Sequence, residues 1–365
     1  MARTGESPVL APSPKNLPFP GFKIQCRTAG LPQGFDSTGF NRGRTGRPPE
    51  SRMRGPLRTE MLYLKLICTA VFWGGTFVAA RIAAREMEPF SAAFLRFVTA
   101  SVFLFGFVFK SHGKIPPLDR RHFPFVLLLG LTGVFAYNAC FFAGLKTITA
   151  SRASLIIATQ PAFIALLSSW FFREKLDSLK IPGIMLSIAG AVTVISRGHP
   201  LTLFSNSIGP GEAYILGCIA SWVSYTLIGK AAMKSLSPLT AVTWSCGVGA
   251  VCLLPFALAE GILRSIGEFS LTAWVGILYL GFFGSALGFF WYYEGIKAIG
   301  AARAGIFINL VPVSSIVLAC LILDETLDAS LAAGAVLVVS GVYLTNRSPL
   351  FRSPPISAVD SSRRR

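Results

Sequence analysis

Long apolar segments separated by short polar connections repeat along the chain from Leu62 to Thr345. Segments of about 20 residues, at 1.5 Å per residue in a helix, cross a hydrocarbon layer of about 30 Å. Most connections are shorter than a dozen residues, so successive helices are expected to be antiparallel. The pattern predicts ten membrane-spanning helices, over residues 62–81, 90–109, 123–143, 151–171, 180–196, 212–230, 239–259, 272–293, 302–322 and 330–346.

The second half of this pattern repeats the first. Residues 144–177 and 295–328 are identical at twelve of 34 positions. FWGGTFVAARIAAREMEPF (72–90) also aligns with SWVSYTLIGKAAMKSLSPL (221–239). The longest connection, near residues 197–211, divides five predicted helices from five. The chain is therefore interpreted as an internal duplication.

A unit with an odd number of spans enters the membrane a second time in the opposite orientation. The expected fold is an all-α polytopic membrane protein with ten transmembrane helices in two inverted five-helix repeats, residues 62–196 and 211–346. Alternating-access carriers have this architecture and bind their substrate near the midplane, between the repeats.

The composition agrees with a lipid environment. The chain is 52% apolar and 14% charged, whereas a soluble domain carries about 25% charged residues. The net charge of +17 lies mostly in the tails, because residues 1–60 and 347–365 together hold +10 of it. Basic tails beside membrane spans are typical of topology signals or contacts with anionic lipid. The lipid bilayer is thus an expected partner, and nucleic acid is not.

The tails are expected to lack structure of their own. Residues 1–60 are rich in Pro, Gly and Arg and show no periodicity, which predicts a disordered basic leader. The composition also suggests the hypothesis that translation starts at Met61 or Met53. Lys and Arg number 11 in the connections on the side of the N-terminus and six on the opposite side. Because positive charge favours the cytoplasm, both termini, including the basic tail 347–365, are expected to be cytoplasmic.

Several of these segments form a family pattern. They are FWGGTFVAARIA in the first span, FLRF in the second, the bends GLKTITASRAS and GIKAIGAARAG, and the runs that end at Glu174 and Glu325. The chain resembles the EamA family of the drug/metabolite transporter superfamily over about residues 62–346. The resemblance implies a ten-helix carrier that exports small polar metabolites such as amino acids across a bacterial inner membrane.

Polar and aromatic residues inside the spans are the candidates for substrate binding. Pro161 and Pro312 remove a backbone N–H near mid-span, and the backbone groups that this frees must find partners, for which lining a cavity is one solution. Tolerated kinks and ordinary packing are the alternative interpretation. The candidate binding or hinge residues are Trp73, Thr76, Arg96, Tyr137, Asn138, Gln160, Pro161, Trp222, Tyr225, Tyr292, Asn309 and Pro312.

Four charged residues have two interpretations each. Arg96 lies about 9 Å from the end of its span, where it can bind a substrate carboxylate or snorkel to the interface. Glu294 is either a coupling proton site or an interfacial residue paired with Lys297. Glu174 and Glu325 are either gates or solvated loop charges.

Other function classes are disfavoured. The predicted spans contain no His, no Asp and no GxSxG, so an enzyme is not expected, and the seven cysteines and three histidines form no metal-binding pattern or cofactor site. No charged ring indicates a channel. The alternative carrier is a phosphorylated-sugar or nucleotide-sugar exchanger, which needs several cations for phosphate. The sequence leaves a homodimer open.

Overall fold

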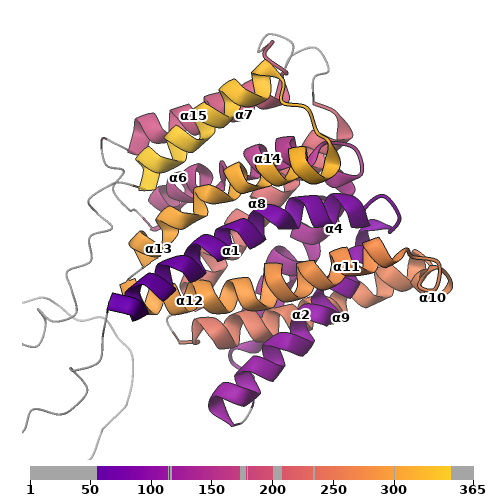
Figure 1. The fold of residues 1–365 in the computed structure, drawn as a ribbon. Helices are drawn as coiled ribbons and strands as arrows, with labels where there is room; N and C mark the ends of the chain where they lie inside the picture. Colours follow the sequence, from indigo (N-terminus) through magenta and orange to yellow (C-terminus); the bar gives the residue numbers. More distant parts are fainter. Residues whose placement is uncertain are drawn as a thin grey trace, which may run out of the picture. The chain divides into compact units, whose positions relative to one another are not determined.

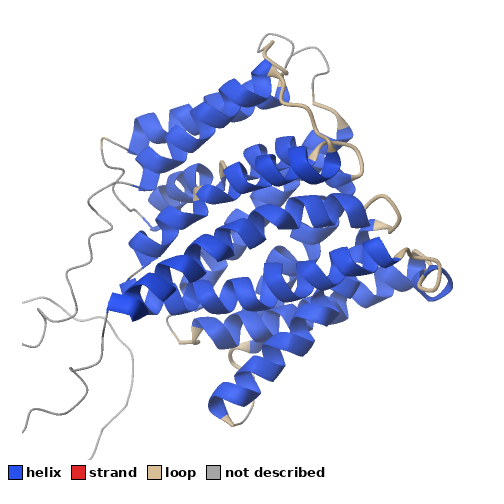
Figure 2. Ribbon diagram, in the orientation of Figure 1, coloured by secondary structure: helices blue, strands red, loops and turns tan. Residues whose placement is uncertain are grey.

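The computed structural model describes the central part of the chain. The described residues are 56–113, 115, 117–172, 178, 180–199, 208–232, 235–299 and 301–346. All regular secondary structure in these ranges is helical (Figure 2). Most of the expected leader 1–60, the expected tail 347–365 and Glu174 lie outside the described residues.

Fifteen α-helices and two π-helices make up the described bundle (Figure 1). They are α1 (Pro56–Ala83), α2 (Pro89–His112), α3 (Phe123–Leu129), η2 (Gly130–Ala136), α4 (Tyr137–Leu145), α5 (Ala150–Ile157), α6 (Gln160–Phe172), α7 (Lys180–Ile195), α8 (Pro210–Ala232), α9 (Pro238–Ala259), α10 (Ile262–Ser265), α11 (Leu271–Tyr279), η4 (Leu280–Leu287), α12 (Gly288–Ile299), α13 (Ala301–Ile308), α14 (Leu310–Leu323) and α15 (Ala329–Asn346).

Eight helical segments of the described residues are long and apolar enough to cross a membrane. The fifth and tenth predicted spans correspond to two shorter apolar helices, Lys180–Ile195 and Ala329–Thr345. Sixteen residues of α7 extend only about 24 Å at 1.5 Å per residue, less than a typical hydrocarbon core. The chain is a multi-pass helical membrane protein with eight full-length candidate spans.

The helices of the two halves pack against one another across the bundle. α2 packs against α9, and α7 packs against α15. α1 contacts η4 and α12 of the second half, while α8 contacts η2 and α4 of the first half. Figure 1 shows that α1 begins and α15 ends at the same end of the bundle, here called the terminal end. The opposite end, which carries the α1–α2 connection and α10, is called the distal end.

Four of the spans are not continuous α-helices. η2 and η4 interrupt the third and eighth spans, and short breaks separate α5 from α6 and α13 from α14. Pro161 and Pro312 each lie in the first turn after a break, where a missing N–H costs no helical hydrogen bond. Each interruption leaves backbone carbonyls that need partners other than the next turn of helix.

The contact between α7 and α15 depends on small residues. A Cβ atom added to Gly183 would lie 2.7 Å from the Thr345 nitrogen and 2.8 Å from the Gly341 oxygen. Both neighbours are backbone atoms, which cannot rotate away. Small residues at helix contacts let membrane helices approach closely, and Gly183 has this role here.

We expect Gly183→Ala to lower the free energy of unfolding by about 1–3 kcal/mol, because the added methyl overpacks the α7–α15 contact. Thermal melting of the purified protein in detergent measures this. Gly106→Ala in α2 is the matched control, since nothing lies within 4 Å of its added Cβ. Equal melting temperatures for the two variants would contradict the assigned packing role.

Candidate functional site

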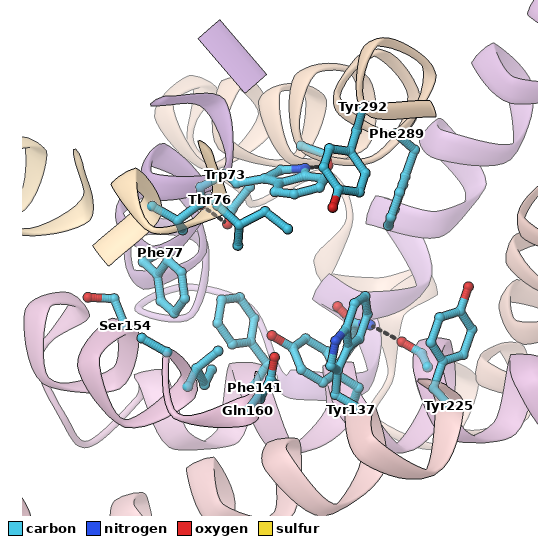
Figure 3. A pocket seen from close by; sticks show the side chains of 18 of the residues that line it. Trp73, Thr76, Phe77, Tyr137, Phe141, Ser154, Gln160, Tyr225, Phe289 and Tyr292 are labelled. Carbon is cyan, nitrogen blue, oxygen red and sulfur yellow. Dashed lines mark hydrogen bonds between the residues drawn. The ribbon is translucent and has the colours of Figure 1, made fainter. Parts of the chain in front are cut away.

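A cavity of about 370 Å³ lies inside the bundle, walled by helices of both halves (Figure 3). Its volume is near the lower end of the range of about 300–1,000 Å³ for small-molecule pockets. All twelve residues that the sequence nominated for binding or hinging line it. They are Trp73, Thr76, Arg96, Tyr137, Asn138, Gln160, Pro161, Trp222, Tyr225, Tyr292, Asn309 and Pro312. Their shared location is observed, and their role stays a prediction.

The sequence analysis missed other residues of the wall. Phe97, Phe141, Ser154, Ser245, Cys246 and Phe289 also line the cavity. The signal for Ser245 was available, because it occupies the position in the second half that Arg96 has in the first. Isolated phenylalanines in apolar helices carry no comparable signal, since most of them are packing residues.

Aromatic rings form two opposing parts of the wall. Trp73 lies with its ring centroid 5.2 Å from that of Tyr292. On the other side, Tyr137 and Trp222 are 5.4 Å apart, and Trp222 stacks on Tyr225 at 5.1 Å. Figure 3 shows Trp73, Tyr292 and Phe289 across the open space from Tyr137 and Tyr225. The cavity therefore offers flat apolar surfaces to a ligand from both halves of the chain.

The two π-helices bring backbone close to these side chains. A Cβ on Gly133 in η2 would overlap the ring of Tyr225 in α8, and a Cβ on Gly284 in η4 would lie 2.5 Å from Cγ2 of Thr76 in α1. Gly133 aligns with Gly284 in the register of the repeat, and Thr76 aligns with Tyr225. The same contact, between one half's first span and the other half's π-helix, thus occurs twice.

Carbonyls of the π-helices accept hydrogen bonds from residues of the cavity. The Trp73 indole N–H donates to the Gly284 carbonyl at 2.9 Å. The Asn138 amide donates to the carbonyls of Gly133 at 3.3 Å and Val134 at 2.9 Å. These bonds fix the orientation of the Asn138 side chain, and its amide oxygen faces Arg96.

Arg96 does not snorkel to the interface but points into the bundle, where the residue is 9% exposed. Its Nη1 donates to Asn138 Oδ1 at 2.9 Å, and its Nε makes a long contact of 3.4 Å with Ser285 Oγ. The guanidinium also lies 5.3 Å from the ring centroid of Phe97. Asn138 belongs to the first half and Ser285 to the second, so Arg96 bridges the two.

Glu294 lies outside the cavity wall, near the terminal end. Its carboxylate pairs with Lys65 of α1 at 2.8 Å, and its side chain is 45% exposed. The sequence suggested Lys297, three positions away, as the partner, and its side chain lies outside the described residues. The described partner, Lys65, is 229 residues away in the sequence. Its predicted role as a coupling site stays a prediction.

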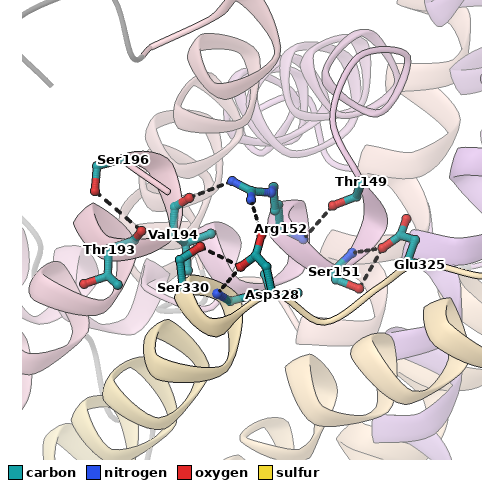
Figure 4. A network of polar contacts seen from close by, with 10 residues as sticks. Thr149, Ser151, Arg152, Thr193, Val194, Ser196, Glu325, Asp328 and Ser330 are labelled. Atoms are coloured by element: carbon teal, nitrogen blue, oxygen red, sulfur yellow. Dashed lines mark hydrogen bonds and ion pairs between the residues drawn. The ribbon is translucent and has the colours of Figure 1, made fainter. Parts of the chain in front are cut away.

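At the distal end, three glutamates bind the N-termini of helices in the other half. Glu86 accepts from the N–H of Ser270 before α11 at 2.9 Å. Glu260 accepts from the N–H of Ser91 in α2 at 2.7 Å. Glu325 accepts from the N–H groups of Ala150 and Ser151 at the start of α5, at 2.7 and 3.0 Å (Figure 4).

A carboxylate at a helix N-terminus satisfies orphan backbone donors and interacts favourably with the helix dipole. Hydrogen bonds from Ser270 accordingly lower the pKa of the Glu86 carboxyl. Beside Glu325, Arg152 pairs with Asp328 at 2.7 Å and donates to the Val194 carbonyl (Figure 4). The distal end is held together by contacts between the halves.

Among the residues that the structure describes, no group of His, Cys, Asp and Glu side chains has the arrangement of a metal site. The cavity thus offers hydrogen bonds, aromatic faces and one positive charge to a small ligand. These are means of binding, and the described lining contains no nucleophile–base pair of the kind that covalent catalysis requires.

The model of the EamA-like transporter family matches the chain twice, over residues 61–196 and 209–347. An uncharacterized transporter, YyaM, of Bacillus subtilis (strain 168) is 30% identical over 82% of this chain and 98% of its own length. A probable amino-acid metabolite efflux pump of Salmonella typhimurium is 28% identical over 76% of this chain and 92% of its own.

A solved crystal structure also shares the fold, with a TM-score of 0.55 and 19% identity over 80% of this chain and 99% of that one. At that identity the likeness concerns the fold alone. The two matched ranges together cover nearly all of the described bundle. The chain belongs to the EamA-like transporter family.

Proposed function

We propose that the protein is a secondary transporter that exports small polar metabolites such as amino acids, by alternating access at the central cavity. The observation that carries this proposal is the cavity itself, which both halves line with aromatic and polar residues. A buried site between two similar halves can be exposed to either side by a change in their packing. The name of the Salmonella relative supports the substrate class.

The architecture that we propose is ten transmembrane helices in two inverted five-helix repeats, residues 62–196 and 211–346. The pairing of α2 with α9 and of α7 with α15 supports it, because equivalent helices meet at a pseudo-twofold axis. The two matching contacts of Gly133 with Tyr225 and of Gly284 with Thr76 support it further. The shorter α7 and α15 then span by local thinning of the bilayer.

The distal contacts are proposed to form one gate. Between the cavity and the distal end lie residues with little exposure, including Met87, Phe142 and Leu145 at 0%. Glu325 holds the start of α5 across the boundary between the halves. Opening the distal end requires breaking such contacts. At the terminal end, the ion pair described between the two halves is Lys65–Glu294. Glu174, outside the described residues, is the proposed counterpart of Glu325 by the repeat.

A phosphorylated-sugar or nucleotide-sugar exchanger fits less well. Phosphate groups are bound by several cations, and Arg96 is the one cation among the described residues that line the cavity. We place the protein in a bacterial inner membrane with both termini cytoplasmic, on the strength of the Lys/Arg distribution and of the bacterial relatives.

The function is tested by efflux from proteoliposomes that contain the full chain and are loaded with a panel of labelled amino acids. We expect efflux of a few of them above that from protein-free liposomes. Acceleration by an imposed pH gradient would assign proton coupling, and Glu294→Gln would then remove it; indifference to the gradient would assign facilitated transport. If no amino acid leaves faster than from protein-free liposomes, amino-acid export is wrong.

Pro161→Ala and Pro312→Ala are each expected to slow transport by roughly five- to tenfold, because the restored N–H can close the helix break with a hydrogen bond worth about 1 kcal/mol. Initial rates in proteoliposomes measure this, with protein incorporation checked by gel. Pro255→Ala is the matched control, since Pro255 is exposed inside α9 and is absent from the cavity lining. Wild-type rates for both cavity variants would contradict a hinge at the breaks.

Glu325→Ala is expected to speed hydrogen exchange of the Ala150 and Ser151 amides by about tenfold or more, because each loses a charged acceptor. Mass spectrometry of peptides covering the start of α5 measures the exchange. Glu268→Ala is the control, because its exposed side chain at the distal end makes no hydrogen bond with the described residues. Equal protection in both variants would show that Glu325 does not hold this end closed.

A further inference from the structure

The charge in the cavity is one-sided. Among the described residues that line it, Arg96 is the one charged side chain, and no Asp or Glu is present. Outside the lining, Glu86, Glu260 and Glu325 already bind helix N-termini, and Glu294 is paired with Lys65. A ligand therefore meets a positive charge in the cavity and no negative one.

Arg96 has no counter-charge among the described residues. Its partners there are an amide oxygen, a hydroxyl and two aromatic rings. The Nη2 group makes no hydrogen bond within the described residues. Burying an unpaired charge is costly, and the cost falls when an anion enters. The guanidinium fork also matches a carboxylate in shape and donor spacing.

The partners of Arg96 hold its direction. Asn138 uses its amide nitrogen on the carbonyls of η2, so its oxygen accepts from Nη1. Ser285 donates its hydroxyl to the Leu280 carbonyl in η4 at 3.1 Å, which leaves a lone pair toward Nε. Each is engaged with a π-helix of its own half. Backbone carbonyls of the π-helices thus orient the two side chains that hold Arg96 toward the cavity, and neither of these neutral side chains cancels its charge.

A second donor in the wall lacks a partner. Gln160 is 8% exposed and lines the cavity from the first turn of α6. Its amide lies beside the Tyr137 side chain, but its nitrogen makes no hydrogen bond of normal geometry within the described residues. A buried donor without a partner is unfavourable, so it gains from a ligand that brings an acceptor. Two donors, the Arg96 guanidinium and the Gln160 amide, would thus gain from a hydrogen-bond acceptor on the ligand.

A ligand ammonium group would have fewer favourable interactions in the same cavity. Carboxylates, the strongest partners of ammonium, are absent from the described lining. The faces of Trp73 and Trp222 can attract a cation, but the positive charge of Arg96 opposes it. An amino group on the ligand is thus tolerated and contributes little.

We infer that the cavity recognises its ligand through a carboxylate, and that small monocarboxylates with an apolar or aromatic body bind without needing an amino group. This inference rests on the proposed function, because it treats the cavity as the substrate site. It specifies the substrate class, from small polar metabolites in general to carboxylates, of which zwitterionic amino acids are one kind.

Three probes with one hydrocarbon body test this: 3-phenylpropanoate, phenylalanine and phenethylamine, which carry a carboxylate, both groups and an ammonium. Calorimetric titration of the full chain in lipid nanodiscs measures their affinities. We expect 3-phenylpropanoate to bind at least as tightly as phenylalanine, and phenethylamine at least about tenfold more weakly, as for the loss of a charge-assisted hydrogen bond. Tighter or equal binding of the amine overturns the inference, and so does failure of all three to bind.

Variants connect the result to Arg96. Arg96→Gln is expected to weaken the binding of 3-phenylpropanoate by about tenfold or more. It is also expected to remove the preference for 3-phenylpropanoate over phenethylamine. Arg96→Lys is expected to retain part of the affinity and part of the preference. Arg264→Gln, which removes an exposed arginine at the distal end, is the control and is expected to bind as wild type. The Lys variant keeps the test valid if the Gln variant does not fold. Unchanged affinity for 3-phenylpropanoate in both Arg96 variants overturns the inference.

Binding is measured without transport, so the two proposals fail separately. Carboxylate preference without efflux of amino acids from proteoliposomes would refute amino-acid export and leave this inference in place. Efflux of amino acids together with tight binding of the amine would refute this inference and leave the proposed function in place.

Discussion

The structure depends on one constraint: backbone polar groups in a membrane interior need partners within the protein. The regular helical hydrogen bonds of the spans that wall the cavity are interrupted at η2, at η4 and at the two proline breaks. Side chains make up the loss. Trp73 donates to the Gly284 carbonyl, Asn138 to those of Gly133 and Val134, and the Thr159 hydroxyl to that of Ile156. The polar lining of the cavity is therefore a consequence of irregular backbone.

The same constraint acts at the distal end, where helices begin. The first N–H groups of a helix have no intrahelical acceptor. For α2, α5 and α11 the acceptor is a glutamate from the opposite half of the chain. One interaction thus caps the start of a helix and joins the two halves. A contact of this kind holds both halves in one arrangement and can be exchanged for water when they separate.

Much of the site was predictable because its residues are unusual for their place in the sequence. Pro161 and Pro312 stand inside apolar spans in both halves, and Arg96 is a cation within a span. Such residues are costly in lipid unless they face a cavity, so all twelve candidates converged on one. The spans were predictable because apolar length is a local property. The shortness of α7 and α15 was visible in the sequence as well, as two spans of seventeen residues.

Pairings over long distances were not predictable. Glu294 has Lys297 one turn away in the sequence, yet it pairs with Lys65, because α1 packs along α12. The π-helices contain no proline and are as apolar as their neighbours, so periodicity gives no sign of them. Glu86 and Glu260 lie just outside the predicted spans, and nothing in the sequence links them to the helices that they bind. These features come from packing between the halves, which one sequence does not encode locally.

The two halves share a scaffold but differ in chemistry. Gly133 and Gly284 occupy equivalent positions, as do Trp73 and Trp222, and these pairs set the shape of the cavity. Arg96 has only Ser245 as its counterpart. Duplication thus explains the symmetric wall, while the charge arises in one half alone. A single buried cation in a symmetric cavity gives a ligand one preferred orientation, since its anionic group has one place to bind. In the proposed mechanism, symmetry therefore supplies the space and the moving halves, and its local violation at Arg96 supplies the selectivity.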